Sequence, residues 1–220
     1  MQNLLREGKP RDRIHYVGHV MIDNLLYQCE KLKSMDGAGA RFPTWPLKQI
    51  NKKYAFLTLH RPSNVDSREI FGQIAAALDE IAGERPIFFP VHPRTKKMIE
   101  QLDIRLSENV IMLPPLSFTE SLFLWKDAEA VLTDSGGLQE ETTALGVPCV
   151  TIRENTERPI TVEIGTNLFR LPFQPLIFMN RYVSVMLCGF IEQIIKIMSD
   201  FNLINVLSPI TFITQMDGNK

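Results

Sequence analysis

The feature that most constrains the fold is a repeated alternation of short apolar runs and longer helical patterns between residues 14 and 152. The apolar runs are rich in β-branched and aromatic residues, and segments between them place apolar residues at helical spacing. This alternation is typical of βαβ units around a parallel sheet. We therefore predict an α/β fold, in which a Rossmann-like parallel sheet is covered by helices on both faces.

The expected elements can be assigned by residue range. Strands are expected at RIHYVG (13–18), YAFLTLH (54–60), PIFFPVH (86–92), NVIMLP (109–114), AEAVLTD (128–134) and PCVTIR (148–153). Helices are expected at 65–83, 94–103, 119–128 and 137–145. The segment 33–53 is rich in Gly, Pro and Lys and is expected to be a loop between a helix and the next strand.

The chain changes character after residue 170. Residues 171–220 are apolar and poor in charge, and they do not continue the alternation of strands and helices. Within them, FIEQIIKIMSDF (190–201) has the spacing of one amphipathic helix. We predict one main domain over residues 1–170 and a divergent, helical tail over residues 171–220. A membrane role for the tail is disfavoured because charged residues interrupt its apolar run.

Charge and cysteine content narrow the class of protein. The 220 residues include 24 basic and 25 acidic ones, so the chain lacks the excess positive charge that attracts nucleic acid or anionic membranes. The three cysteines, Cys29, Cys149 and Cys188, are odd in number and widely spaced, which suits reduced thiols and not a disulfide framework. The N-terminal residues lack the apolar run of a secretory signal. We predict a cytoplasmic protein without a metal site, a nucleic-acid partner or a membrane anchor.

Polar residues stand at the ends of three predicted strands. His60 and Arg61 end the second strand, His92 ends the third, and Asp134 and Ser135 end the fifth. In open α/β sheets the carboxyl ends of parallel strands meet at one edge, where ligands bind. We therefore expect these residues to share a binding site.

The residues Ser135, Gly136 and Gly137 lie between the fifth predicted strand and the helix that follows it. The first N–H groups of a helix have no intrahelical acceptor, and glycines without Cβ allow a phosphate to approach them closely. The Ser135 hydroxyl would add a hydrogen bond, so the turn fits a diphosphate. Glu141 follows about one helical turn later, where its carboxylate would accept hydrogen bonds from the vicinal diol of a ribose.

A structural alternative stays open at this point. In it Ser135 is a helix cap, the glycines form a tight turn, and Glu141 and its neighbour are first-turn acids that complement the helix dipole. The segment RENTERP (153–159) favours the anion site, because it brings Arg153 and Arg158 to the same sheet edge. A guanidinium group binds phosphate with two parallel hydrogen bonds.

Four stretches in order carry a resemblance to a known family. They are RIHYVGHVMIDNLL (13–26), TLHRPSNVD (58–66), FPVHPRT (89–95) and LTDSGGLQEETTALGVPCVTIRENTERPITVEIGTN (132–167). Together they resemble the bacterial, non-hydrolysing UDP-N-acetylglucosamine 2-epimerase family. The resemblance covers about residues 4–169. It corresponds to the second half of that family's two-domain, glycosyltransferase-B-like architecture, which implies that a missing N-terminal half completes the enzyme.

The resemblance implies a role for six residues. In members of this family the matching residues imply that the diphosphate of UDP is held by Ser135, Gly136 and Gly137 and that the ribose hydroxyls are bound by Glu141. The resemblance also implies that Arg158 faces the nucleotide phosphates and that His60 takes part in catalysis.

The activity implied by the resemblance is the reversible conversion of UDP-GlcNAc into UDP-ManNAc. It runs through elimination of UDP to a 2-acetamidoglucal and re-addition from the other face. No redox cofactor is required, and the carboxylates that move the C2 proton are expected from the N-terminal half. The expected partners are UDP, a UDP-sugar and that half, with a homodimer left open. Three alternatives remain: a non-catalytic nucleotide-sugar binding module, a hydrolysing epimerase and a glycosyltransferase.

Overall fold

The computed structural model describes residues 2–34, 42–153, 155–163, 166–169 and 189–200. The helices are α1 (Gln2–Arg6), the 3-10 helix η1 (Arg11–Arg13), α2 (Val20–Ser34), α3 (Trp45–Ile50), α4 (Pro62–Val65), α5 (Arg68–Glu84), α6 (Pro93–Gln101), α7 (Phe118–Trp125), α8 (Gly136–Leu145), α9 (Pro159–Glu163) and α11 (Gly189–Asp200). The strands are β1 (Ala55–Thr58), β2 (Ile87–Pro90), β3 (Val110–Leu113), β4 (Ala130–Thr133), β5 (Cys149–Thr151) and β6 (Asn167–Phe169).

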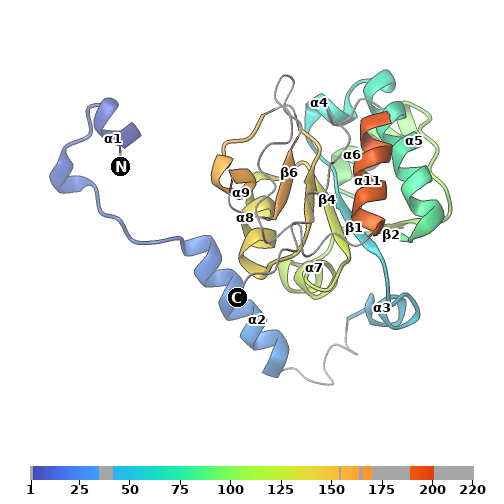
Figure 1. The fold of residues 1–220 in the computed structure, drawn as a ribbon, viewed down its shortest axis with the longest axis horizontal. Coiled ribbons are helices and arrows are strands. Elements are labelled where there is room, and N and C mark those ends of the chain that lie inside the picture. Colours follow the sequence, from blue (N-terminus) through green and yellow to red (C-terminus); the bar gives the residue numbers. More distant parts are fainter. Residues whose placement is uncertain (1, 35–41, 154, 164–165, 170–188, 201–220) are drawn as a thin grey trace, which may run out of the picture.

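The strands form one sheet of six in the order β3-β2-β1-β4-β5-β6, and each neighbouring pair is parallel. Chain order reverses between β1 and β4, which pair with Leu57 opposite Leu132 and Thr58 opposite Thr133. Such a reversal opens a crevice beyond the carboxyl ends of the two strands, where this class of sheet binds its ligands. The predicted α/β fold with a parallel sheet is confirmed (Figure 1).

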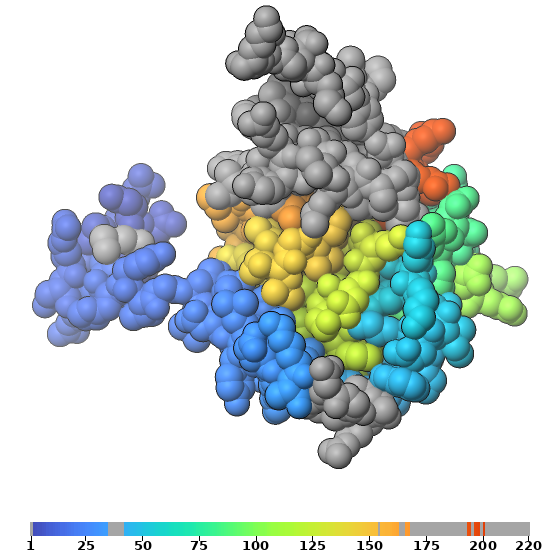
Figure 2. All heavy atoms as spheres, turned by 60° about the horizontal axis from the view of Figure 1, so that its bottom comes forward, coloured from blue at the N-terminus to red at the C-terminus, as the bar shows by residue number. Residues whose placement is uncertain are grey.

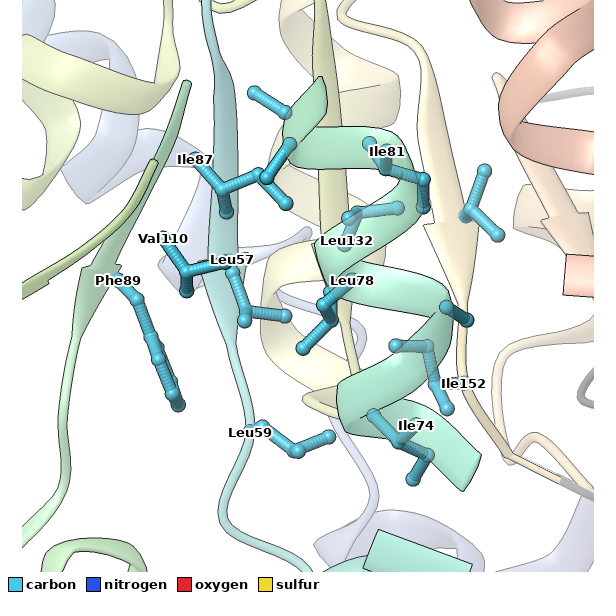
Figure 3. Close-up of a cluster of buried hydrophobic side chains, with 14 of the residues drawn as sticks. Leu57, Leu59, Ile74, Leu78, Ile81, Ile87, Phe89, Val110, Leu132 and Ile152 are labelled. Carbon is cyan, nitrogen blue, oxygen red and sulfur yellow. The ribbon is translucent and has the colours of Figure 1, made fainter. Parts of the chain in front are cut away.

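One face of the sheet is covered by α5 and α11 (Figure 1). Alternate residues of the strands point to this face, as the period of two along a strand requires. On β1 they are Ala55 and Leu57, which pack with Leu78 and Ile81 of α5, as Figure 3 shows for the last three. Each fully buried leucine or isoleucine contributes about 1.5–3 kcal/mol relative to exposure.

The opposite face is covered by α2, α7 and α8. Phe56, Phe88 and Val131, the intervening residues of three strands, pack here with Leu122 and Leu138. Helices on both faces were predicted and are confirmed by these two separate cores. Figure 2 shows the blue residues of α2 lying against the yellow residues of α8, whereas α1 and η1 stand away from the body.

The predicted strand at 13–18 is wrong. Part of its range is η1, and residues 14–18 form neither a helix nor a strand. Tyr16 is 87% exposed and Val17 is 72% exposed, so these β-formers have no neighbouring strand against which to pair. Several further elements were missed, among them α4, α9 and α3, which lies inside the predicted loop 33–53. The missed strand β6 forms the edge of the sheet beside β5.

The tail is described only over α11, which coincides with the predicted amphipathic helix at 190–201. Its residues Ile194, Ile197 and Met198 are buried in the core beside α5. The rest of the predicted tail lies outside the described residues, and the division into residues 1–170 and 171–220 stays a prediction. Over the described part of the chain, the model contains no helix whose length and apolarity would let it cross a membrane.

Candidate functional site

Asp134 joins the ends of the two central strands. Its side chain is 0% exposed, and its Oδ2 accepts hydrogen bonds from the backbone N–H groups of His60 (2.9 Å) and Arg61 (2.7 Å) and from Asn64 Nδ2 (3.1 Å). Its Oδ1 lies 2.9 Å from His60 Nδ1. One buried carboxylate therefore fixes both the loop after β1 and the orientation of the His60 ring.

The pair of Asp134 and His60 shifts the pKa of both groups. The hydrogen bond to Asp134 raises the pKa of His60 above its ordinary value and outweighs the opposing effect of partial burial. Burial raises the pKa of Asp134, but the hydrogen bonds from His60 and Arg61 outweigh it, and the pKa lies below its ordinary value. The outcome is an ionised aspartate that favours the protonated, cationic imidazole at the sheet edge.

The first turn of α8 is left without a side-chain cap. Ser135 occupies the N-cap position, but its side chain makes no capping hydrogen bond, and the first turn contains no acidic residue. By contrast, the N-cap serines Ser67 and Ser117 accept hydrogen bonds from Ile70 N–H and Glu120 N–H. The alternative in which Ser135 caps the helix and first-turn acids balance its dipole is therefore wrong. The positive end of α8 therefore has neither a side-chain cap nor an acidic residue from its own first turn.

The segment after β5 brings charged side chains to this helix end. Arg153 Nη2 lies 2.7 Å from Glu157 Oε2, and Arg61 Nη2 lies 3.5 Å from Glu157 Oε1. A Cβ added at Gly136 would overlap Glu157 Oε1 and would lie 3.6 Å from Arg153 Nη1. The loops after β1 and β5 and the head of α8 thus converge on one small volume.

Glu141 lies in the second turn of α8 and is only 8% exposed. Burial, assisted by the neighbouring charge of Glu140, raises the pKa of Glu141 to about 7. Glu140 itself lies 3.0 Å from His19 Nε2, and its other oxygen lies 3.3 Å from Arg158 Nε. Arg158 is therefore held against α8, one turn from the glycines.

The structure gathers the predicted residues of the segments after β1, β4 and β5 around the head of α8, and their roles stay predictions. His92 follows β2 as the N-cap of α6, and its ring centroid lies 6.2 Å from that of His60. Asp134 was noted at a strand end, yet its position as the shared acceptor was missed, and Glu157 was missed entirely. The signal for Asp134 was an acid placed directly after a largely apolar strand, whereas nothing in the sequence marks Glu157. Among the described residues, no cluster of three or more His, Cys, Asp or Glu side chains is arranged for a metal ion.

Comparison with known proteins identifies the family. The model of the UDP-N-acetylglucosamine 2-epimerase family matches residues 1–176. The chain belongs to this family. The predicted family is confirmed, and the uncapped turn of α8 and the Asp134–His60 pair are features of a UDP-N-acetylglucosamine 2-epimerase family member.

Individual members of the UDP-N-acetylglucosamine 2-epimerase family are similar over much of the chain. A UDP-N-acetylglucosamine 2-epimerase of Methanocaldococcus jannaschii is 39% identical over 172 residues, which are 76% of this chain and 46% of that protein. A UDP-2,3-diacetamido-2,3-dideoxy-D-glucuronate 2-epimerase of Pseudomonas aeruginosa is 35% identical over 171 residues, or 76% of this chain and 45% of that protein.

A solved structure of a family member supports the same relationship. The crystal structure of the Methanocaldococcus jannaschii UDP-GlcNAc 2-epimerase in complex with UDP-GlcNAc and UDP is similar with a TM-score of 0.70 and 33% identity, covering 90% of this chain and 58% of that one. The chain therefore spans about half the length of the relatives that it matches.

Proposed function

We propose that the head of α8 binds the diphosphate of a uridine nucleotide sugar. We further propose that the protein to which this chain contributes interconverts UDP-GlcNAc and UDP-ManNAc. The observation that carries the proposal is the uncapped first turn of α8, where Ser135 leaves the amides free of its side chain. Helix amides, glycines without Cβ and nearby arginines together suit a phosphate group. Membership of the family supports uridine as the nucleoside.

Each predicted residue has a part in this proposal. The Ser135 hydroxyl and the amides of Gly136 and Gly137 hold the diphosphate, and Glu141 accepts hydrogen bonds from the ribose. Arg158 neutralises charge on the phosphates after it leaves Glu140. His60, whose protonated form is favoured by Asp134, supports the chemistry from the end of β1.

In the proposed reaction, the main change of charge is stabilised by the half of the enzyme that this chain represents. The anomeric C–O bond breaks and the C2 proton departs, giving UDP and a 2-acetamidoglucal; UDP then returns to C1 as a proton adds to C2 from the other face. Negative charge grows on the leaving diphosphate, and fixed donors around it lower the barrier. The amides of α8 and the protonated form of His60 would be donors of this kind.

Calorimetric titration with UDP tests the proposal. The chain is expected to bind UDP, and Gly136→Ala is expected to weaken binding by at least about tenfold, because its methyl group takes the place of a phosphate oxygen. The fold should survive, since the atom that this methyl meets ends the flexible side chain of Glu157. Gly72→Ala, in the middle of α5, is the matched control. Equal UDP affinity for all three proteins would remove the basis of the proposal.

A second candidate differs in the sugar. The relative that acts on UDP-2,3-diacetamido-2,3-dideoxy-D-glucuronate, by its name, is 35% identical, close to the 39% of the UDP-GlcNAc enzyme. Identity alone therefore favours GlcNAc only slightly. NMR analysis of products from both substrates, with the completed protein, separates the two candidates and also detects free ManNAc from a hydrolysing enzyme. A homodimer and a cytoplasmic location stay predictions.

A further inference from the structure

A carboxylate already occupies the space in front of α8. Glu157 Oε1 lies so close to the point where a Cβ of Gly136 would be that the two atoms would overlap, and Glu157 Cδ is 3.2 Å from that point. Glu157 comes from the segment between β5 and α9, 21 residues after Gly136 in the chain. The positive helix end is thus faced by an anion that α8 itself does not supply.

Two arginines hold this carboxylate from different loops. Arg153 Nη2 lies 2.7 Å from one carboxylate oxygen, and Arg61 Nη2 lies 3.5 Å from the other. The Arg153 side chain is only 8% exposed, whereas the Glu157 side chain is 47% exposed. The cation is therefore built into the protein, and the carboxylate can swing into solvent.

Arg153 also carries a donor that Glu157 does not satisfy. Arg153 Nη1 is buried and has no hydrogen-bond partner among the described residues. It lies 3.6 Å from the point where a Cβ of Gly136 would be, so it faces the same volume. A buried donor without an acceptor is unfavourable. A phosphate, with more oxygens than a carboxylate, would satisfy both the arginine and the helix amides.

We propose that Glu157 competes with the diphosphate for the site at Gly136. The Glu157 carboxylate occupies this site until UDP displaces it, and Arg153 then passes from Glu157 to the phosphate. This inference rests on the proposed binding of UDP at α8. It adds Arg153 to the phosphate-binding residues and gives Glu157 the role of setting the affinity.

The competition acts over the whole physiological pH range. The hydrogen bond from Arg153 lowers the pKa of Glu157 to about 2, so its carboxylate stays ionised. A site that is open only part of the time shows an affinity reduced by the open fraction. Removal of the competitor should therefore tighten the binding of any ligand that carries the phosphate groups.

The test uses the full chain and three ligands: UDP, inorganic pyrophosphate and uridine. Glu157→Gln and Glu157→Ala are expected to bind UDP and pyrophosphate roughly tenfold more tightly than the unchanged chain. Uridine has no phosphate and should show no gain. Glu30→Gln is the matched control, because Glu30 is also an exposed, ion-paired glutamate, 2.7 Å from Lys33. It should change none of the three affinities.

Arg153→Gln, combined with Glu157→Ala, tests the second part. The double variant should lose the gain and bind UDP more weakly than Glu157→Ala alone. Unchanged or weaker UDP binding by both Glu157 variants, with normal binding by the unchanged chain, would overturn the inference and leave the proposed function intact. Failure of every protein to bind UDP would instead remove the proposed function, and the inference with it.

Discussion

At the scale of single residues, the contact between Asp134 and His60 has a direct electrostatic consequence. Asp134→Asn removes the negative charge that raises the pKa of His60, so this pKa should fall. NMR titration of the imidazole signals measures the change. Asp66→Asn is the control, because Asp66 is an exposed aspartate paired with Arg94 and not with His60. An unchanged His60 pKa in Asp134→Asn would show that the hydrogen bond does not govern the protonation of the ring.

Glu141 gives a second residue-scale prediction, in the stability of the fold. Its pKa is about 7 in the folded chain against an ordinary 4.5, so the neutral form stabilises the fold. This contribution is complete below about pH 4.5 and is lost as pH rises through about 7. Glu141→Gln keeps the group neutral and should stabilise the chain by up to about 3 kcal/mol above that range, and not at acid pH.

Chemical unfolding at about pH 4 and about pH 8 measures this difference. Glu80→Gln, an exposed position on α5, should show no such pH-dependent gain. A Glu141→Gln chain that is less stable at alkaline pH would mean that the buried carboxylate has a favourable partner in the fold. The expected result would mark Glu141 as a candidate for ligand binding, because perturbed buried carboxylates cluster at functional sites.

The residues of the site were predictable only where their chemistry depends on local sequence. Ser135, Gly136 and Gly137 follow a strand and open a helix, so their amides point outward whatever the rest of the chain does. The acceptor role of Asp134 depends on β1 and β4 being neighbours, although 75 residues separate Thr58 from Thr133. Glu157 depends on the path of a loop. Neither spacing nor composition encodes these tertiary contacts.

At the scale of elements, the C-terminal end of α8 requires a glycine for its backbone conformation. Gly146 closes the helix with a φ of 71°, in the left-handed region that side chains disfavour. Gly146→Ala should therefore destabilise the chain by about 1 kcal/mol. Gly72→Ala, inside α5 with nothing within 4 Å of the added methyl, should stabilise it by about 0.5–1 kcal/mol. Thermal unfolding of both variants measures these changes in stability. A stabilised Gly146→Ala variant would contradict the assignment of Gly146 to the end of α8.

The long apolar pattern predicted its helix correctly, whereas short patterns succeeded for β5 and failed for two other segments. The apolar spacing of 65–83 is fulfilled by α5, whose buried face includes Phe71, Ile74 and Leu78. The range 13–18 contains β-formers without a partner strand, and strands need partners. β6 has only three residues and is defined by its pairing with β5, so no local periodicity in the sequence predicts it.

At the scale of the whole molecule, the sheet order explains why one site collects residues from three loops. The reversal between β1 and β4 places His60 beside Asp134, and β5 follows directly, so its loop delivers Arg153 and Glu157 to the head of α8. The crevice faces outward from the carboxyl edge of the sheet. A sugar attached to a diphosphate at α8 would extend from this edge, away from the two cores.

The carboxylates at this edge of the sheet are poorly suited to remove and return the C2 proton of that sugar. Glu157 is bound by Arg153, Glu140 by His19 and Arg158, and Asp134 by His60. The contact with Arg153 lowers the pKa of Glu157, and the hydrogen bonds from His60 and Arg61 hold the pKa of Asp134 below its ordinary value, so these two carboxylates are weak bases. Glu141 is proposed to bind the ribose. The acid and base of the proposed epimerisation are therefore expected in the part of the relatives' length that this chain does not span.

Complementation tests this division of labour. The chain alone should bind UDP and form no UDP-ManNAc from UDP-GlcNAc, because donors at the diphosphate cannot replace a base at C2. Addition of a separate polypeptide equivalent to the other half of a relative should restore turnover, measured by NMR of the sugar anomeric signals. The same mixture with Gly136→Ala should stay inactive, which ties the recovered activity to α8. Rapid epimerisation by the chain alone would place the missing acid and base among its own residues and refute the division.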